Sequence, residues 1–171
     1  MKPIPIEIER KYIIEIPEEE KMRLCNGYTV SEIVQIYIES QSHVTHRVRS
    51  RKTNGKTVYT ETKKIRIDKM SSYEDEKEIS EREFQSFSEK IKTGTVPVVK
   101  LRHSFDYLGQ TFEIDVYPQW KISCIMETEL ESRDKCVEFP EFIKIIKEVT
   151  GDKVYSNASM AQNFPVEFNK K

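Results

Sequence analysis

The sequence predicts an α+β protein built on an eight-stranded antiparallel β-barrel, a tunnel with a polar, charged lumen and helices packed outside. Three observations lead to this prediction. Most of the 171 residues fall in segments in which apolar and polar residues alternate, as they do in half-buried strands. Two connections between such segments read as tight turns. The charged residues gather on one face of the strands, and most strands carry charges of a single sign.

Length and charge place the chain among globular proteins. A chain of 171 residues suits one domain, which we expect to span residues 1–171. The 28 basic residues nearly cancel the 29 acidic ones, and no basic tail is present. A nucleic-acid partner is therefore not expected. We expect a small-molecule partner instead, and a monomer or a homodimer.

The sequence also carries signals about location. No apolar run approaches the ~20 residues that a membrane-spanning helix needs, so no membrane partner is expected. The first residues mix acidic and basic side chains and do not resemble a signal peptide. The three cysteines are widely spaced and fit reduced, structural thiols. These features predict a cytoplasmic protein.

Eight segments alternate as strands do. They are residues 3–15, 32–40, 43–52, 56–68, 73–80, 96–105, 110–117 and 121–131. Asn54-Gly55, between two of these segments, is the strongest short signal for a two-residue hairpin. Leu108-Gly109-Gln110 predicts a second turn.

The hairpin also predicts the register of its two strands. A two-residue loop pairs Thr53 with Lys56, and this register pairs Arg47 with Thr62. Lys64 then shares the face of the arginines. Its neighbour Lys63 points to the opposite face.

Helices are predicted at residues 17–25, 80–92 and 139–150. The first opens with a proline and three glutamates, which suit the positive end of a helix dipole. The second has a serine cap and a glutamate three residues later, the pattern of a capping box. The third has one apolar face and stops at Gly151. A short helical turn is expected in the tail before Pro165.

The charges on the strands are sorted by sign. The predicted inward acidic residues are Glu7, Glu9, Glu74, Glu76, Glu78, Glu113, Asp115, Glu127 and Glu129, and the basic ones are Lys11, Arg47, Arg49, Arg51, Lys64, Lys100 and Arg102. For any one strand, a solvated face over an apolar core is the alternative. Like charges on neighbouring surface positions repel, however, so the joint pattern favours a lumen with an acidic and a basic sector. Acids suit a hard divalent cation, and bases suit phosphate oxygens.

The order of these motifs resembles the CYTH family, the triphosphate tunnel metalloenzymes. The matching segments are Glu7–Lys11 (E-x-E-x-K), Gln35–Ile38, Arg47–Arg49 (R-x-R), Tyr59–Lys64, Glu76–Ile79, Lys100–Arg102, Phe112–Tyr117, Glu127–Leu130, Glu148–Lys153 and Tyr155–Asn157. The resemblance covers essentially the whole chain. The compact length and short C-terminal segment look most like the small single-domain bacterial triphosphatases.

The resemblance implies hydrolysis of a triphosphate with Mg²⁺ or Mn²⁺, inorganic triphosphate first and a nucleoside or organic triphosphate next. Two alternatives stay open. One is a class IV-type adenylyl cyclase that makes cyclic AMP from ATP. The other is a non-catalytic module that binds polyphosphate or a nucleotide. A binding module would be expected to show a broken set of metal ligands, and here the set is intact.

The resemblance and the strand faces together suggest roles. The expected metal ligands are Glu7, Glu9, Glu127 and Glu129, with Asp115 and Glu113 as second contributors that hold metal-bound water or orient lysines. The expected triphosphate-binding residues are Arg47, Arg49, Lys64, Lys100 and Arg102. Lys11 and Tyr37 are expected beside the reacting phosphorus. The alternatives are salt bridges to the lumen arginines for the carboxylates and a simply satisfied hydroxyl for Tyr37. The three histidines match no ligand spacing and are expected to be structural.

Overall fold

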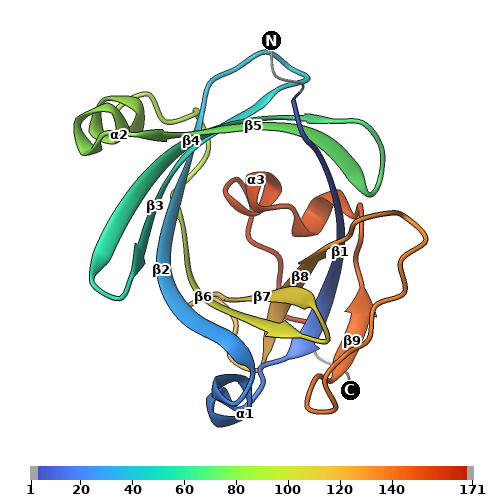
Figure 1. Cartoon of the computed structure of the whole chain (residues 1–171). Helices are drawn as coiled ribbons and strands as arrows, with labels where there is room; N and C mark the ends of the chain where they lie inside the picture. The colour runs from blue at the N-terminus through green and yellow to red at the C-terminus, as the bar shows by residue number, and fades with distance from the viewer. Residues whose placement is uncertain (1–3, 169–171) are drawn as a thin grey trace.

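The structure is a computed structural model that describes residues 4–168. Eight strands form a closed antiparallel barrel, as predicted (Figure 1). The strands are β1 (Ile6–Glu15), β2 (Asn26–Ile38), β3 (Thr45–Thr53), β4 (Lys56–Arg66), β5 (Ser71–Ile79), β6 (Val98–Tyr107), β7 (Gln110–Val116) and β8 (Ser123–Glu129). None of the helices in the described part of the chain is long and apolar enough to span a membrane.

Strand β1 closes the barrel by pairing along both of its edges. On one edge, Glu9–Glu15 pairs with β8. The other edge is divided, because Ile6–Ile8 pairs with β5 and Tyr12–Ile14 pairs with a ninth strand, β9 (Ile145–Glu148). Strand β9 thus continues along β1 where β5 turns away. The barrel is thus closed through β1, and β9 lies beside it as an outer strand that pairs with β1 alone among the described strands.

The predicted register of the β3–β4 hairpin is confirmed. Thr53 pairs with Lys56, and Arg47 pairs with Thr62. Both loop residues, Asn54 and Gly55, have positive φ, as the two-residue hairpin turn requires.

The helices lie outside the strands or behind the barrel. Helix α1 (Glu19–Arg23) and helix α2 (Glu81–Ser88) fall where the sequence predicted them, and α2 has the predicted capping box at Ser80. The helical turn in the tail is also confirmed, as a 3₁₀ turn at Lys153–Tyr155 followed by α3 (Asn157–Met160).

The predicted helix over residues 139–150 is wrong, since this segment is irregular apart from β9. A single amphipathic helix of that length is marginal on its own. Here the backbone of Ile145–Glu148 instead pairs with the part of β1 that β5 does not reach, and so provides hydrogen-bond partners for its N–H and C=O groups. Ile143 packs into the core. Hydrogen bonding to a strand distant in sequence therefore determines the conformation of this segment, although its apolar residues have helical spacing.

Strand β2 also differs from the prediction, because it begins at Asn26 rather than at residue 32. Its added residues pair with the end of β6 around a register shift between Asn26 and Thr29. Gly27 in that irregularity has a positive φ of 64°, which the alternation pattern could not reveal. The other strand bounds differ from the predictions by a few residues, and the predicted start at residue 3 lies outside the described residues.

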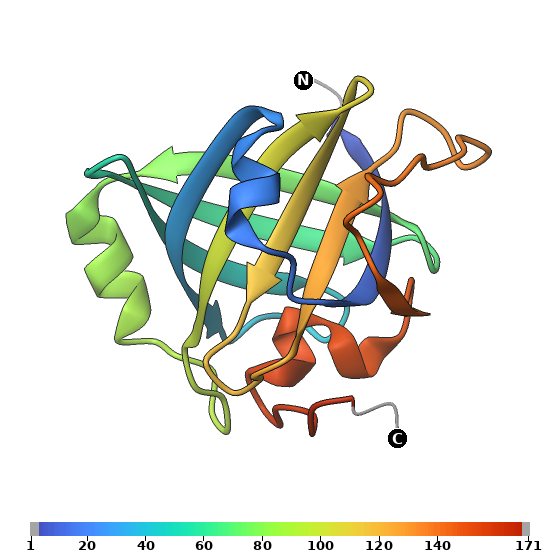
Figure 2. The ribbon, with the colours of Figure 1, turned by 90° about the horizontal axis from the view of Figure 1, so that it is seen from below.

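Apolar side chains form two clusters on the outer wall and one at the rear of the barrel. The outer clusters centre on Phe105 and Phe112, near α1, and on Ile36 and Val48, under α2. The rear cluster joins strand residues to α3 and consists of Tyr37, Val98, Tyr117, Trp120, Ile125, Met160 and Ala161. In Figure 2 α3 lies against one end of the barrel, and this cluster packs it onto the strands there, so that α3 forms a floor to the barrel.

The segment after α3 fastens this floor to the barrel. Pro165 accepts a hydrogen bond from the Trp120 indole N–H through its carbonyl oxygen, at 3.0 Å. The Glu167 carboxylate accepts hydrogen bonds of 2.6–2.9 Å from the backbone N–H groups of residues 121–123. Although burial opposes it, this donor set lowers the pKa of Glu167 to about 2.

Candidate active site

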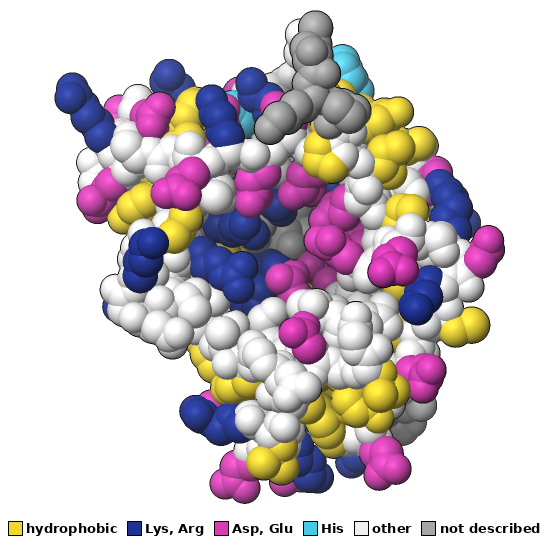
Figure 3. All heavy atoms as spheres, in the orientation of Figure 1, with side chains coloured by type: hydrophobic (Ala, Val, Ile, Leu, Met, Phe, Trp, Pro, Cys, Tyr) yellow, Lys and Arg dark blue, Asp and Glu magenta, His cyan; other side chains and the backbone are white. Residues whose placement is uncertain are grey.

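A cavity of about 680 Å³ occupies the barrel between the floor and the open end. Its charged lining comes from seven strands and includes Glu7, Glu9, Lys11, Arg47, Arg49, Arg51, Lys64, Glu74, Glu76, Lys100, Arg102, Glu113, Glu127 and Glu129. Figure 3 shows the hollow with basic side chains on one side and acidic side chains on the other. The sequence-based division of the lumen into two sectors is therefore seen in the structure.

Two predicted lumen acids do not line this cavity. Glu78 lies near the end of β5 and is exposed. Asp115 is completely buried behind the lining. Its carboxylate binds Lys100 Nζ at 2.6 Å and Arg102 Nε at 2.6 Å. Burial alone would raise the pKa of Asp115, but these two cations outweigh it and hold the pKa below its usual range.

The acidic side is built on the β1–β8 ladder. Glu9 pairs directly with Glu129, and Lys11 pairs with Glu127. The Lys11 ammonium forms an ion pair of 2.8 Å with Glu127, whose other oxygen lies 3.2 Å from Arg102. Burial raises the pKa of Glu129. Carboxylates from neighbouring strands are thus brought close together, as a cation site requires.

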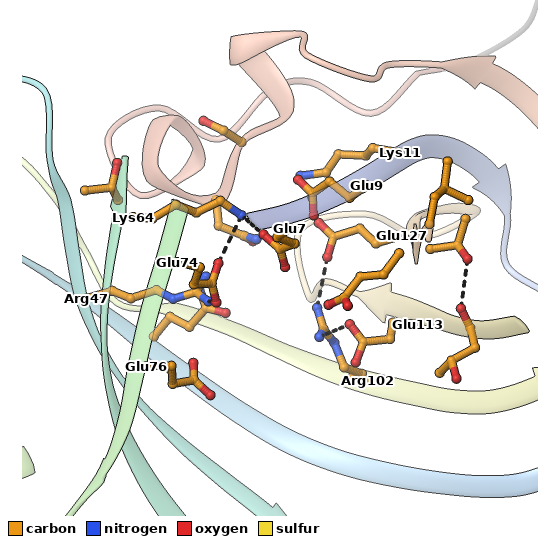
Figure 4. A pocket seen from close by; sticks show the side chains of 18 of the residues that line it. Glu7, Glu9, Lys11, Arg47, Lys64, Glu74, Glu76, Arg102, Glu113 and Glu127 are labelled. Carbon is orange, nitrogen blue, oxygen red and sulfur yellow. Dashed lines mark hydrogen bonds and ion pairs between the residues drawn. The ribbon is translucent and has the colours of Figure 1, made fainter. Parts of the chain in front are cut away.

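Glu7 belongs to a second group of acids around one lysine. Lys64 Nζ contacts Glu7 and lies 3.2 Å from Glu74 (Figure 4). Burial, with Glu9 and Glu74 nearby, raises the pKa of Glu7 to about 8, although Lys64 acts in the opposite direction. Burial would lower the pKa of Lys64, but the surrounding carboxylates raise it. One ammonium cannot neutralise the carboxylates of Glu7, Glu9 and Glu74 together. Lys64 therefore keeps its proton, and Glu7 takes up a proton as well.

The basic side carries donors that the protein itself does not use. Arg47 lies 3.4 Å from Glu74, and Arg49 lies 3.1 Å from Glu76. The Nε atoms of both arginines are buried, and neither has a hydrogen-bond partner among the described residues. Such donors are costly unless something accepts from them, and phosphate oxygens are suitable acceptors.

Lys11 and Tyr37 lie on the wall of the same cavity. The Tyr37 hydroxyl accepts a hydrogen bond from Gln35 Nε2 at 3.2 Å, and its side chain is 5% exposed. Burial raises the pKa of Tyr37, although Arg47 and Lys11 nearby oppose the rise. At neutral pH the hydroxyl keeps its proton and remains a donor.

The acidic side has the oxygen ligands that Mg²⁺ and Mn²⁺ prefer. No three acidic, histidine or cysteine side chains of residues 4–168 are arranged as a preformed metal site, however. Several of the carboxylates are engaged by Lys11, Lys64 and Arg102 instead. The donor chemistry therefore fits a hard divalent cation, provided that the acids exchange ammonium and guanidinium partners for it.

Sequence reasoning missed the loop residues that complete the lining. These are residues 108–110, 130–131, 135, 153 and 156–159, which lie in loops and turns, at the start of β7 and in α3. No periodic pattern marks such residues. The Leu108-Gly109-Gln110 turn and the Tyr155–Asn157 segment had been singled out, but without a role in the site. None of the three histidines lines the cavity. His46 bonds Glu61 at 2.8 Å, and His103 bonds the Tyr28 hydroxyl at 2.9 Å.

Comparisons with known proteins agree with the fold. No family model matches the sequence, and no curated protein matches it. Among solved structures, the inorganic triphosphatase NE1496 is similar, with 26% identity and a TM-score of 0.59 over 93% of this chain and 96% of that one. The PH1819 protein from Pyrococcus horikoshii OT3 is 24% identical, with a TM-score of 0.58 over 75% of this chain and 80% of that one. A conserved hypothetical protein from Pyrococcus furiosus is 21% identical, with a TM-score of 0.55 over the same shares.

Proposed function

We propose that this chain, which has the fold of the triphosphate tunnel metalloenzymes (CYTH proteins), hydrolyses inorganic triphosphate to diphosphate and phosphate with Mg²⁺ or Mn²⁺. The observation that carries the proposal is the pairing of an acidic and a basic side across one cavity. A metal-bound polyphosphate needs both, because carboxylates hold the ion and cations hold the phosphate oxygens. The similarity to a structure described as an inorganic triphosphatase supports the choice of reaction.

In this proposal the basic side binds the substrate. The triphosphate-binding residues are Arg47, Arg49, Lys64, Lys100 and Arg102, all of which line the cavity. The Nε donors of Arg47 and Arg49, which have no partner among the described residues, would be satisfied by phosphate oxygens if the guanidinium groups turned toward a bound triphosphate. Fixed positive charge also stabilises the transition state of phosphoryl transfer.

The acidic side holds the metal. Its proposed ligands are Glu7, Glu9, Glu127 and Glu129, with Glu113 as a further contributor. A divalent ion bound there supplies charge neutralisation and a more acidic water. Lys11, which pairs with Glu127 in the metal-free protein, would be the ammonium that donates to the transferred phosphoryl group if Glu127 held the metal. Tyr37, protonated at neutral pH, can orient the attacking water or a phosphate oxygen.

The lining favours inorganic triphosphate over a nucleotide. Tyr37 is the only aromatic side chain among the described residues that line the cavity, and it is nearly buried. A nucleobase is usually held by stacking on an aromatic face, and the lining provides no exposed face of this kind. A cyclase would additionally need a pocket that fixes the ribose and the base.

The test is phosphate release by the purified protein from inorganic triphosphate, with Mg²⁺ or Mn²⁺ and with a chelator. We expect release that the chelator abolishes, and a higher kcat/KM for inorganic triphosphate than for ATP or thiamine triphosphate. Cyclic AMP formed from ATP, detected by mass spectrometry, would identify a cyclase instead. Tight calorimetric binding without phosphate release across several metals would identify a binding module.

A further inference from the structure

One buried carboxylate holds two of the proposed substrate-binding cations. Lys100 and Arg102 lie two residues apart on the inner face of β6, and Asp115 pairs with Arg102 from β7. Asp115 Oδ1 accepts from Arg102 Nε at 2.6 Å. Its Oδ2 accepts from Arg102 Nη2 at 2.7 Å and from Lys100 Nζ at 2.6 Å.

Asp115 differs from the other acids of the barrel in its access to the cavity. Its side chain has no exposed surface, and it is not part of the lining, whereas Glu113 and Glu127 are. A carboxylate offers about four acceptor positions, and three of these are already taken by charged donors. A metal ion would have to displace these donors to reach it.

We propose that Asp115 is a positioning residue for Lys100 and Arg102 and not a metal ligand. The inference rests on the proposed function, because it concerns how the basic side is held ready for triphosphate. Both cations are almost completely buried, at 1% and 7% side-chain exposure, so each needs a charged partner to remain in place. Asp115 is this charged partner, and it contacts both cations from outside the cavity lining.

The two-pronged contact with Asp115 also fixes the plane of the Arg102 guanidinium. Its Nη1 contacts Glu113, and its Nη2 lies 3.2 Å from Glu127 (Figure 4). The guanidinium therefore bridges the buried carboxylate and the acids of the cavity wall. If those acids held a metal, Asp115 would still orient the Arg102 guanidinium toward the cavity, where phosphate oxygens could accept from its Nη atoms. Arranging donors before the substrate arrives reduces the cost of binding.

The test compares Asp115→Asn with the wild type in two calorimetric titrations without turnover. Mn²⁺ is titrated in the absence of triphosphate, and triphosphate is titrated in the presence of a chelator. We expect Asp115→Asn to bind Mn²⁺ within about threefold of the wild type and to bind triphosphate about 10-fold more weakly. Glu9→Gln is the matched control, and it should lose Mn²⁺ affinity and keep metal-free triphosphate binding.

The opposite pattern would overturn the inference. A fall of about 10-fold in Mn²⁺ affinity for Asp115→Asn, with triphosphate binding unchanged, would make Asp115 a metal ligand. If the wild type hydrolyses triphosphate and the Asp115→Asn substitution changes neither titration, Asp115 has no positioning role. A wild type that neither binds nor hydrolyses triphosphate would contradict the proposed function itself, and this inference with it.

Two more variants keep the test decisive if Asp115→Asn alone does not fold. The double variant Lys100→Gln/Asp115→Asn removes one buried cation together with the anion, so the net charge of the cluster is unchanged. It is compared with Lys100→Gln. Equal Mn²⁺ affinity and weaker triphosphate binding in the double variant support positioning of Arg102 by Asp115. Weaker Mn²⁺ binding in the double variant, with equal triphosphate affinity, contradicts it.

Discussion

Glu9 of β1 and Glu129 of β8 lie directly opposite each other across the ladder that closes the barrel. Like charges in such a pair repel by about 0.2–1 kcal/mol. Neither carboxylate forms an ion pair with another described side chain, in contrast to Glu127 two residues away. A divalent cation between Glu9 and Glu129 would convert the repulsion into binding energy.

The first prediction concerns Glu9→Gln, which keeps the shape of the side chain and removes its charge. We expect turnover of triphosphate to fall by about 100-fold or more, since even partners behind metal ligands contribute about 10–100-fold. The metal-free variant should melt up to about 4 °C higher than the wild type, because the repulsion with Glu129 is gone. Phosphate release and thermal unfolding in a chelator measure the two effects. Glu32→Gln, on the outer face of β2, is the control and should change neither. A variant with normal turnover would remove Glu9 from the metal site.

The second prediction uses the neighbours Lys63 and Lys64. Lys64 faces the cavity with its ammonium between Glu7 and Glu74, whereas Lys63 points outward and is 55% exposed. Lys64→Ala should raise the KM for triphosphate by about 10-fold or more, because a buried phosphate-binding charge is lost. Lys63→Ala should change kinetics less than twofold and stability by less than about 0.5 kcal/mol. Steady-state kinetics on both variants checks this, and equal effects would argue against a substrate role for Lys64.

The third prediction separates charge from geometry at Arg49. Arg49→Lys retains the positive charge but loses the planar fork and the buried Nε donor. We expect the KM for triphosphate to rise by about 10-fold, with a smaller change in kcat. Arg82→Lys on the exposed α2 is the matched control. If Arg49→Lys behaves like the wild type, charge alone would account for the role of this residue.

The fourth prediction is a pH dependence of the stability of the metal-free protein. The pKa of Glu7 is about 8 in the folded state, against an ordinary value of 4.5. Between these values the folded state binds more protons than the unfolded state, so stability falls as pH rises from about 4.5 to 8. Thermal unfolding in a chelator across this range should show a smaller fall for Glu7→Gln than for the wild type. Parallel curves for the two proteins would show that Glu7 titrates normally.

The fifth prediction concerns the anchor of the floor. Glu167→Ala leaves three backbone N–H groups at residues 121–123 without their acceptor, so the free energy of unfolding should fall by about 1–3 kcal/mol. Because the folded-state pKa of Glu167 is about 2, its contribution is present above the ordinary value of 4.5 and is lost as pH falls toward 2. Denaturant unfolding at pH 7 and pH 3 measures both effects. Glu141→Ala, in an exposed part of the chain, serves as the control.

The barrel and its lumen could be predicted from the sequence because strand geometry is local. The two-residue hairpin loop determined the register, and the register determined which of Lys63 and Lys64 faces inward. The helix predicted at 139–150 was wrong for the opposite reason. Its apolar residues repeat with the helical period, but the free edge of β1, more than 100 residues away in sequence, determines their conformation.

The side-chain contacts of the site were less accessible to sequence reasoning. Alternation placed Asp115 with the other lumen acids, but its burial depends on how Lys100 and Arg102 share its two oxygens. The ion pairs of Lys11 and Lys64 likewise depend on rotamers that no pattern encodes. The loop residues around the cavity carry no period at all.

The divided edge of β1 has a consequence for how the chain is made. As the polypeptide leaves the ribosome, β1 emerges before all of its partner segments, and these follow at three later points of synthesis as Ser71–Tyr73, Ser123–Glu129 and Ile145–Glu148. Until the last of them is synthesised, part of the backbone of β1 has no strand beside it. Pairings between such distant segments form slowly, and unpaired strands invite association with other chains. The alternating charges of Glu7, Glu9 and Lys11 oppose such association of β1 while the barrel is incomplete.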